Sequence, residues 1–159
     1  MADKIRMENA KIIWRNFSGK ADKFNPKGGK RSFSVIIEDG EMAAALAADG
    51  WNIKQLKPRT EEEEENPKHS LQVKVSFDVK PPRIYLVTRN NKVLMNEDTV
   101  DSLDYAEIAN IDLVITPYSY DVNGKSGVAA YLKTMYVTVV EDEFADKYDF
   151  GDSEEIPFD

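Results

Sequence analysis

Cysteine is absent from the 159-residue chain, and histidine occurs once, as His69. Without thiols the chain can form no disulfide framework, no thiolate zinc site and no catalytic cysteine. A single histidine also excludes a His-rich metal site and acid–base chemistry that pairs two histidines. The longest unbroken apolar run covers residues 42–48, far short of the roughly 20 residues that cross a bilayer. The N-terminus shows no apolar signal segment either, so we expect a soluble protein of the cytoplasm.

Apolar residues are nonetheless plentiful. Hydrophobic residues make up 42% of the chain, and two Trp, seven Tyr and seven Phe are among them. This much apolar material supports a packed core, which excludes wholesale disorder. A chain of this length predicts one ordinary domain, or one domain with a tail.

Charge is distributed unevenly along the chain. The net charge of −8 equals the charge of residues 141–159 alone, where nine acidic residues accompany one Lys. Residues 1–140 hold 20 basic and 20 acidic residues and sum to zero, and five of those acids are consecutive at positions 61–65. The first 37 residues carry nine Lys and Arg against three acids. A basic front and an acidic tail predict a polyanionic partner on one face and a regulatory or protein-binding tail.

Alternation of apolar and polar residues predicts β-structure for most of the first 140 residues. Residues 71–79 are the clearest case, because apolar side chains occupy every second position. We expect strands at residues 11–17, 31–38, 51–57, 71–79, 84–89, 92–95, 108–120 and 127–140. The pair Asn90 and Asn91 and, more strongly, the pair Asn123 and Gly124 suit tight hairpin turns. Short helices are expected at residues 41–48 and 96–105, and a mobile loop at 58–68.

These elements predict an all-β fold with short helical inserts. Five or more strands that end in a long hairpin fit an OB-fold best, a five-stranded barrel with hairpin extensions that presents a nucleic-acid-binding face. We expect this OB-fold domain to cover residues 1–140. Residues 141–159 are expected to form an acidic, disordered C-terminal tail.

Cationic and aromatic residues are dense near the N-terminus. Single-stranded nucleic acid needs both kinds of group, because cations neutralise phosphates and rings stack on unpaired bases. The residues predicted to bind are Trp14, Arg15, Phe17, Lys20, Lys23, Phe24, Lys27, Lys30 and Arg31. Trp51 is a further candidate that could equally belong to the core. Phe33 alternates with apolar neighbours on one strand face, so we expect it in the core.

A second group of the same composition surrounds the last predicted turn. Its members are Tyr118, Tyr120, Lys125, Tyr131 and Lys133. Side chains two positions apart on a strand share a face. Tyr131 and Lys133 are therefore expected to point the same way.

The end of the tail is an acidic spacer followed by an apolar tip. Residues proposed to bind a partner protein are Asp152, Glu154, Glu155, Ile156, Pro157 and Phe158. An acidic, disordered segment offers no core in which to bury a ring. The sequence therefore predicts a short peptide ligand whose apolar tip enters another protein's pocket while its acids contact basic rims.

Two resemblances support this interpretation. The acidic lead into Ile156, Pro157 and Phe158 resembles the tip of bacterial single-stranded DNA-binding proteins, although Asp159 here displaces the terminal carboxylate by one residue. The stretches WRNFSGKADKFNPKGGKRSFSV, DGWNIK and NGKSGVAAYLKTMYV resemble bacteriophage-encoded single-stranded DNA-binding proteins. The resemblance implies an OB-fold that coats unwound DNA during replication or recombination, in the host cytoplasm, with a tail that recruits replication proteins.

We therefore expect a non-enzymatic protein that binds and protects single-stranded DNA largely without sequence preference. No catalytic residue, metal site, cofactor or membrane contact is predicted, and self-association is left open. One alternative is a metal-dependent nuclease that uses the carboxylates of Asp98, Asp101, Asp104 and Glu107, which would share a helical face at this spacing. The other is an acidic DNA mimic that blocks a host protein, which the net charge favours and the basic front opposes.

Overall fold

The computed structural model describes residues 3–21, 26–78 and 80–140. Within these residues the chain forms one mixed sheet of nine strands. The strands are β1 (Ile5–Met7), β2 (Ile12–Asn16), β3 (Arg31–Ile37), β4 (Ile53–Gln55), β5 (His69–Val75), β6 (Arg83–Val87), β7 (Lys92–Met95), β8 (Ile108–Val122) and β9 (Lys125–Val139). Three short helices, α1 (Gly40–Ala48), α2 (Glu61–Glu65) and the 3₁₀-helix η1 (Val100–Asp104), complete the described chain. The prediction of a mostly β fold with short helical inserts is confirmed.

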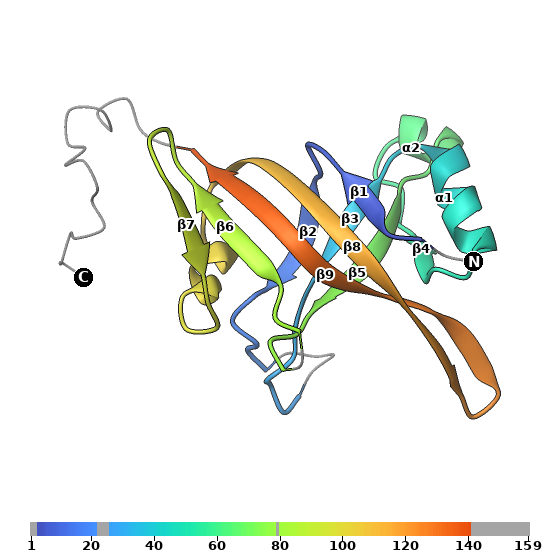
Figure 1. The fold of residues 1–159 in the computed structure, drawn as a ribbon. Helices are drawn as coiled ribbons and strands as arrows, with labels where there is room; N and C mark the ends of the chain where they lie inside the picture. Colours follow the sequence, from blue (N-terminus) through green and yellow to red (C-terminus); the bar gives the residue numbers. More distant parts are fainter. Residues whose placement is uncertain (1–2, 22–25, 79, 141–159) are drawn as a thin grey trace.

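The sheet curls into a partly open barrel (Figure 1). Its strand order is β1-β8-β9-β5-β3-β2, and the two end strands are joined by residues 8–11 alone. This link bends at Asn9, whose φ is 53°, and it bonds to both sides. The amide of Ala10 donates to the carbonyl of Ile111 at 2.8 Å, and the amide of Ile36 donates to the carbonyl of Lys11 at 2.9 Å. One bent segment therefore pairs with β8 and β3, which gives the five-stranded OB-fold barrel that the sequence predicted.

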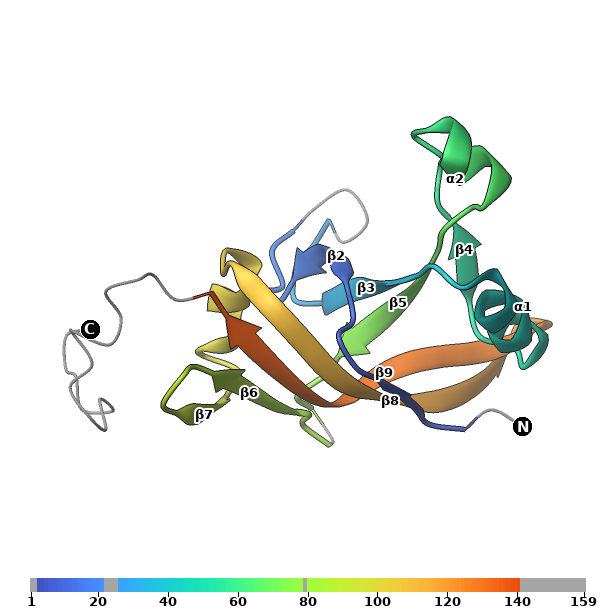
Figure 2. The same cartoon turned by 90° about the horizontal axis from the view of Figure 1, so that it is seen from above.

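Three further strands, β4, β6 and β7, are attached to this barrel. β4 runs antiparallel to the first half of β5, on the edge of β5 whose second half pairs in parallel with β9. The edge of β9 that pairs with β5 also pairs in parallel with β6 further along, and β6 forms a hairpin with β7. Figure 2 shows α1 and α2 at one end of the sheet and the β6–β7 hairpin at the other.

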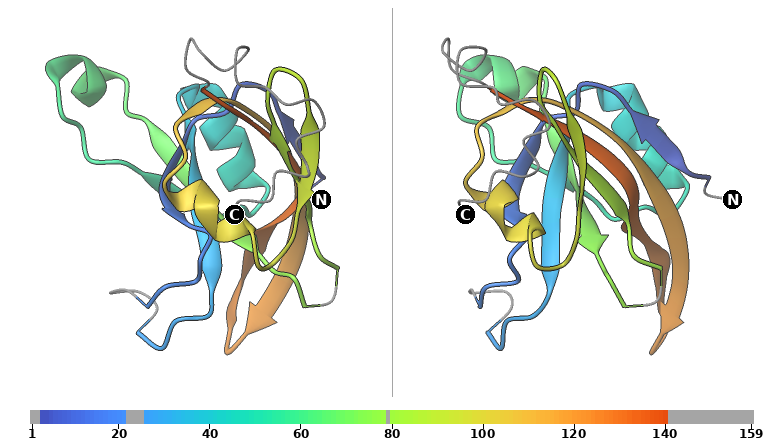
Figure 3. Two further views of the ribbon diagram at one scale, coloured as in Figure 1. Left: turned by 90° about the vertical axis from the view of Figure 1, so that its left-hand side faces the viewer. Right: turned by 60° about the vertical axis from the view of Figure 1, so that its left-hand side comes forward.

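The β8–β9 hairpin extends beyond the barrel. Its two strands pair from Ile108 with Val139 to Val122 with Lys125, and the register shifts twice along the way. The turn lies at Asn123 and Gly124, which have φ values of 53° and 80°. Positive φ at both central positions matches the twist of the flanking strands. Figure 3 shows the hairpin projecting downward, on the same side of the molecule as residues 17–21 and 26–30, the described parts of the connection between β2 and β3.

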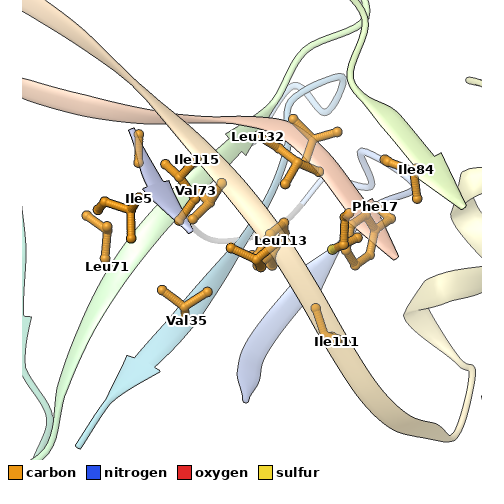
Figure 4. Packing of buried hydrophobic residues seen from close by; sticks show 14 of the residues in the cluster. Ile5, Phe17, Val35, Leu71, Val73, Ile84, Ile111, Leu113, Ile115 and Leu132 are labelled. Carbon is orange, nitrogen blue, oxygen red and sulfur yellow. The ribbon is translucent and has the colours of Figure 1, made fainter. Parts of the chain in front are cut away.

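The core fills the interior of the barrel. Along β5, Leu71, Val73 and Val75 are buried while Gln72 and Lys74 are exposed, as the alternation predicted. Figure 4 shows such side chains converging from several strands. The largest fully buried side chains include those of Phe17, Phe33, Leu71, Ile84, Leu103, Ile111, Ile115 and Met135. The core position predicted for Phe33 is confirmed.

Local signals explain the short helices. Asp39 caps α1 by accepting hydrogen bonds from the amides of Glu41 and Met42. The prediction of a mobile loop over residues 58–68 is wrong for residues 61–65, which form α2. Thr60 accepts a hydrogen bond from the amide of Glu63 at 3.1 Å, so the Thr-x-x-Glu spacing was a helix-start signal. None of the described helices is long and apolar enough to span a membrane.

Candidate nucleic-acid interface

One outer face of the barrel lies between two projecting segments. In OB-folds, oligonucleotides bind the face of the second and third barrel strands, flanked by the loop before them and the loop between the last two strands. Here those strands are β3 and β5, and the flanking segments are the connection from β2 to β3 and the β8–β9 hairpin. Figures 1 and 3 show the hairpin and the described residues of that connection, 17–21 and 26–30, projecting downward from the barrel. The topology therefore selects this face as the candidate interface.

A pocket opens on this face where β4 and β9 diverge over β5. Its volume is about 320 Å³, and it is lined by Asn52, Ile53, Lys54, Gln72, Lys74, Ala129 and Ala130. Sequence reasoning missed the four polar members of this set. Gln72 and Lys74 could have been found, because they occupy the outward positions of the clearest alternating strand. Asn52 and Lys54 carried no comparable signal, since only the fold brings β4 beside β9.

Lys74, one of the residues that line this pocket, adjoins the Tyr131 ring, and Tyr131 in turn contacts Tyr118. The two tyrosine rings meet edge to face, with ring centres 5.7 Å apart. The ammonium nitrogen of Lys74 lies 5.8 Å from the centre of the Tyr131 ring. Tyr118 is 61% exposed. These three residues, hereafter the hairpin platform, combine an accessible ring with a cation, as the binding of single strands requires.

Tyr120, close to the turn of the β8–β9 hairpin, is bonded to the residue that precedes β4. Its hydroxyl donates a hydrogen bond to Oδ1 of Asn52 at 3.2 Å. The hydroxyl passes so close to Gly127 that a Cβ there would lie 2.7 Å from it. A side chain at position 127 would therefore displace the Tyr120 ring. Lys125 is exposed beside the hairpin turn.

Two aromatic residues of the predicted site are core residues instead. Phe17 has no exposed surface and stacks on Phe33 with ring centres 5.3 Å apart. Trp51 is 3% exposed and forms a bridge with Val128. Neither ring can stack on a base while the barrel is folded, so their assignment to the interface was wrong. The barrel interior takes them because burying a large ring is strongly favourable.

Two cations of the predicted site hold the barrel together. The guanidinium of Arg15 donates to the carbonyls of Leu103 and Ala106 at 2.8 and 2.9 Å. Arg31 donates from Nε to the carbonyl of Phe17 at 2.9 Å and forms an ion pair with Glu97 at 3.3 Å. The first third of the chain is therefore cationic partly for structural reasons.

The carboxylate of Asp104 belongs to the same junction. It accepts hydrogen bonds from the amides of Phe17 and Ser18 at 2.6 and 3.2 Å. The helix η1 covers only two of the four acids that the nuclease alternative needs, Asp101 and Asp104. The expected row on one helical face is therefore wrong. Across residues 3–21, 26–78 and 80–140, no three His, Asp or Glu side chains are grouped so as to hold a metal ion.

The other members of the front group that the structure describes are accessible. Trp14 is 66% exposed and has a φ of 54°, at an irregularity in the pairing of β2 with β3. Lys20 contacts the hydroxyl of Tyr105, and this hydrogen bond raises the pKa of Lys20. Lys27 and Lys30 are exposed. Lys23, Phe24 and the tail residues Asp152, Glu154, Glu155, Ile156, Pro157 and Phe158 lie outside the described residues.

Lys133 stands apart from the hairpin platform. The pKa of Lys133 is lowered, chiefly by a hydrogen-bonding contact with the Lys4 amine, and also by charge repulsion from Lys4 and Lys80. The pairing of β8 with β9 is irregular at this point, because Ile115 pairs with Leu132 while Val114 pairs with Thr134. Lys133 is thus the extra residue of a β-bulge.

Solved structures with the same fold include those of a single-stranded DNA-binding protein of bacteriophage Enc34. The Enc34 protein in complex with ssDNA is 13% identical, with a TM-score of 0.56 and 88% of each chain covered. Its C-terminally truncated form is 11% identical, with a TM-score of 0.53 and coverage of 88% of this chain and 86% of that one. At these identities the likeness establishes the OB-like fold.

Sequence comparison supplies the family. No curated protein matches the chain. A family model described as "Putative phage ssDNA-binding domain" matches residues 1–158, nearly the whole sequence. The chain therefore belongs to the phage ssDNA-binding domain family.

Proposed function

We propose that the chain binds single-stranded DNA, without catalysis and largely without sequence preference, across the outer face of β3 and β5. The observation that carries the proposal is the hairpin platform, which stands beside a polar pocket between two projecting segments. Family membership supports it. The solved structure of the Enc34 protein in complex with ssDNA, which shares the fold, supports it as well.

The proposed mechanism divides the work between two kinds of side chain. Lys54 and Lys74, which line the pocket, neutralise phosphates of the bound strand. This releases counterions and makes the affinity salt-dependent. Tyr118 and Tyr131 stack on bases, and such stacking tolerates any sequence because every base has a flat face. Duplex DNA keeps its bases stacked inside, so it offers only its phosphates to the protein.

The direct test is a titration with a fluorescently labelled single strand and with the same sequence as a duplex. We expect the single strand to bind more tightly. We also expect the double variant Lys74→Ala/Tyr131→Ala to lose most of that preference while the control Lys11→Ala, on the β2 side of β3, keeps it. Equal affinity for both DNA forms, or a preference that survives the double variant, would contradict the proposal.

We further propose that residues 141–159 act as an acidic tail that competes with DNA for residues 1–140. Nine acids on one segment resemble a short polyanion, and tethering gives an effective concentration of about millimolar for a short flexible linker. The attraction is ionic, so it weakens as the Debye length falls to about 3 Å at 1 M salt. A chain ending at residue 140 is expected to bind DNA more tightly than the full chain at low salt and equally at high salt. Unchanged affinity at low salt would reject the competition.

The tip of the tail is proposed to recruit a replication or recombination protein in the cytoplasm. Phe158→Ala removes a ring and no charge. It is therefore expected to abolish recruitment while DNA affinity stays normal. A pull-down with purified replication proteins measures the first, and the titration above measures the second. Full recruitment by Phe158→Ala would reject the role of the tip.

A further inference from the structure

A second cluster of tyrosines and lysine lies near the other end of β9. The Tyr85 and Tyr136 rings stack with centres 4.8 Å apart and an angle of 15° between their planes. The ammonium of Lys92 lies over both, 4.9 and 5.7 Å from the ring centres. Tyr136 is 37% exposed. We call these three residues the distal platform, because they repeat the composition of the hairpin platform and because each platform has one tyrosine on β9.

A β-bulge brings both platforms to one face of the sheet. Tyr131 and Tyr136 are five positions apart, and an odd spacing places side chains on opposite faces of a regular strand. The extra residue at Lys133 changes this parity, because pairing shifts between Leu132 and Thr134. Leu132 on one side of the bulge and Met135 on the other both point into the core. Tyr131 and Tyr136 therefore both face outward.

Cations occupy the stretch between the two platforms. Lys133 lies beside Lys4, and Lys80 is close enough to repel it. Like charges that crowd at a surface disfavour one another, and an anion bound among them removes that cost. The platforms are roughly 15 Å apart at the usual rise of a strand. This distance exceeds one stacked base, so a strand that spans it must carry phosphates past Lys133.

The charges around Tyr136 also indicate on which side of the distal platform the DNA strand would continue. A pocket of about 250 Å³ adjoins Tyr136 on the side of β1 and β8, and it is lined by Arg6, Met7, Glu8, Asp112, Leu113, Val114, Thr134 and Tyr136. Arg6 is paired with Glu8 at 3.0 Å, and Asp112 accepts a hydrogen bond from the amide of Asn9. The lining of this pocket thus offers two acids and a cation that is already paired. The side of Tyr136 that faces the β6–β7 hairpin carries Lys92 instead, and is therefore the favourable side for a phosphate.

We propose that the distal platform is a second base-stacking site, reached by a single strand that runs along β9 from the hairpin platform past Lys4, Lys80 and Lys133. The inference rests on the proposed function and adds to it the direction in which the bound strand runs and the length of the surface that it covers. The ligand is the continuation of the same nucleic-acid strand. The competing interpretation is a purely structural role for the tyrosine pair, as a cross-strand contact that stabilises the β6–β7 hairpin.

The test compares strands of two lengths. OB-folds bind about 4 to 16 nucleotides. A strand of roughly 6 nucleotides therefore covers only the face of β3 and β5 with the hairpin platform, whereas one of roughly 16 also reaches the distal platform. Tyr85→Ala/Tyr136→Ala is expected to weaken binding of the long strand about tenfold and to leave the short strand unchanged. Val93→Ala, an exposed residue of the same hairpin on the opposite strand face, is the matched control and should change neither. Equal effects on both lengths, or none on the long strand, would overturn the inference.

A charge variant keeps the test decisive if the tyrosine variant unfolds. Lys4→Ala/Lys80→Ala/Lys133→Ala removes three exposed cations and no packed ring. The log–log salt slope for the long strand is expected to flatten by about 0.7 for each phosphate that is no longer neutralised, and the slope for the short strand to stay the same. An unchanged slope for the long strand rejects the path. Failure of the wild-type protein to bind the short strand would instead reject the proposed function itself.

Discussion

The two basic and aromatic groups in this sequence have the same composition, but the fold buries or bonds part of one group and leaves the rings of the other at the surface. In the front group, between Trp14 and Arg31, the fold buries Phe17 and uses two arginines to bond carbonyls inside the β2–η1–β3 junction. In the β8–β9 hairpin, Tyr118 and Tyr131 remain at the surface beside a polar pocket. Trp14, Arg15 and Phe17 lie on β2 or next to it, where the barrel closes, whereas the hairpin extends beyond the barrel. Composition therefore indicates a nucleic-acid surface only where the fold leaves the side chains outside.

Substituting the buried ring of the front group should have the largest effect. Phe17→Ala leaves a cavity against Phe33, so we expect the free energy of unfolding to fall by about 3–5 kcal/mol. Urea denaturation measures the loss, with Trp14→Ala as an exposed aromatic control. If Phe17→Ala kept the wild-type free energy of unfolding but lost DNA binding, Phe17 would belong to the interface. The two groups would then not differ in the way described above.

The next largest effect tests whether Arg15 is structural. Its charged hydrogen bonds to the carbonyls of Leu103 and Ala106 are worth about 1.5–3 kcal/mol to folding, because their loss leaves those carbonyls unsatisfied. Arg15→Ala should lower the unfolding midpoint in urea and leave the salt dependence of DNA binding unchanged. A flatter salt slope at unchanged stability would show that Arg15 contacts phosphate.

The converse behaviour is expected in the hairpin. Tyr118→Ala should weaken binding of single strands by about 1–3 kcal/mol through the loss of base stacking. Its melting temperature should barely change, because the ring is mostly exposed. Fluorescence anisotropy and thermal melting measure the two effects, and Tyr118→Phe serves as the control that keeps the ring. A sharp drop in melting temperature with unaltered binding would make Tyr118 a packing residue.

The smallest effect concerns the accessible lysines of the front group. Replacing Lys27 and Lys30 with Ala should flatten the salt slope by about 0.7 for each phosphate that these lysines neutralise. Lys11→Ala, an exposed lysine that pairs with Glu38, should leave the slope as it is. If both variants give the wild-type slope, the connection between β2 and β3 does not contact DNA and the hairpin acts alone.

Much of the fold could be predicted because its signals are local. Alternation placed β3, β5 and the long β8–β9 pair, and Asn123 with Gly124 marked the turn that joins the latter. β1 was missed, because a strand of three residues shows no periodicity. α2 was missed because the acidic composition of residues 58–68 masked the capping signal of Thr60 and Glu63.

The candidate site was predictable only in part, because its residues meet through the topology. Lys74 and Tyr131 come from β5 and β9, which become neighbours through a parallel pairing that leaves no mark in the sequence. The same holds for Asn52 and Tyr120, whose hydrogen bond joins residues 68 positions apart. The face of Tyr136 depends on a bulge at Lys133, and one inserted residue reverses every later side chain.

The sequence by itself determined which segments are strands, where the sharp turns fall, and that a basic front and an acidic tail sit at opposite ends of the chain. These properties depend on spacing and composition, which act between near neighbours. Only the tertiary structure decided which rings are buried and which cations bond to carbonyls. A side chain of one type is stabilised either by burial or by exposure according to the face on which it emerges, and that face is set by the pairing of distant strands.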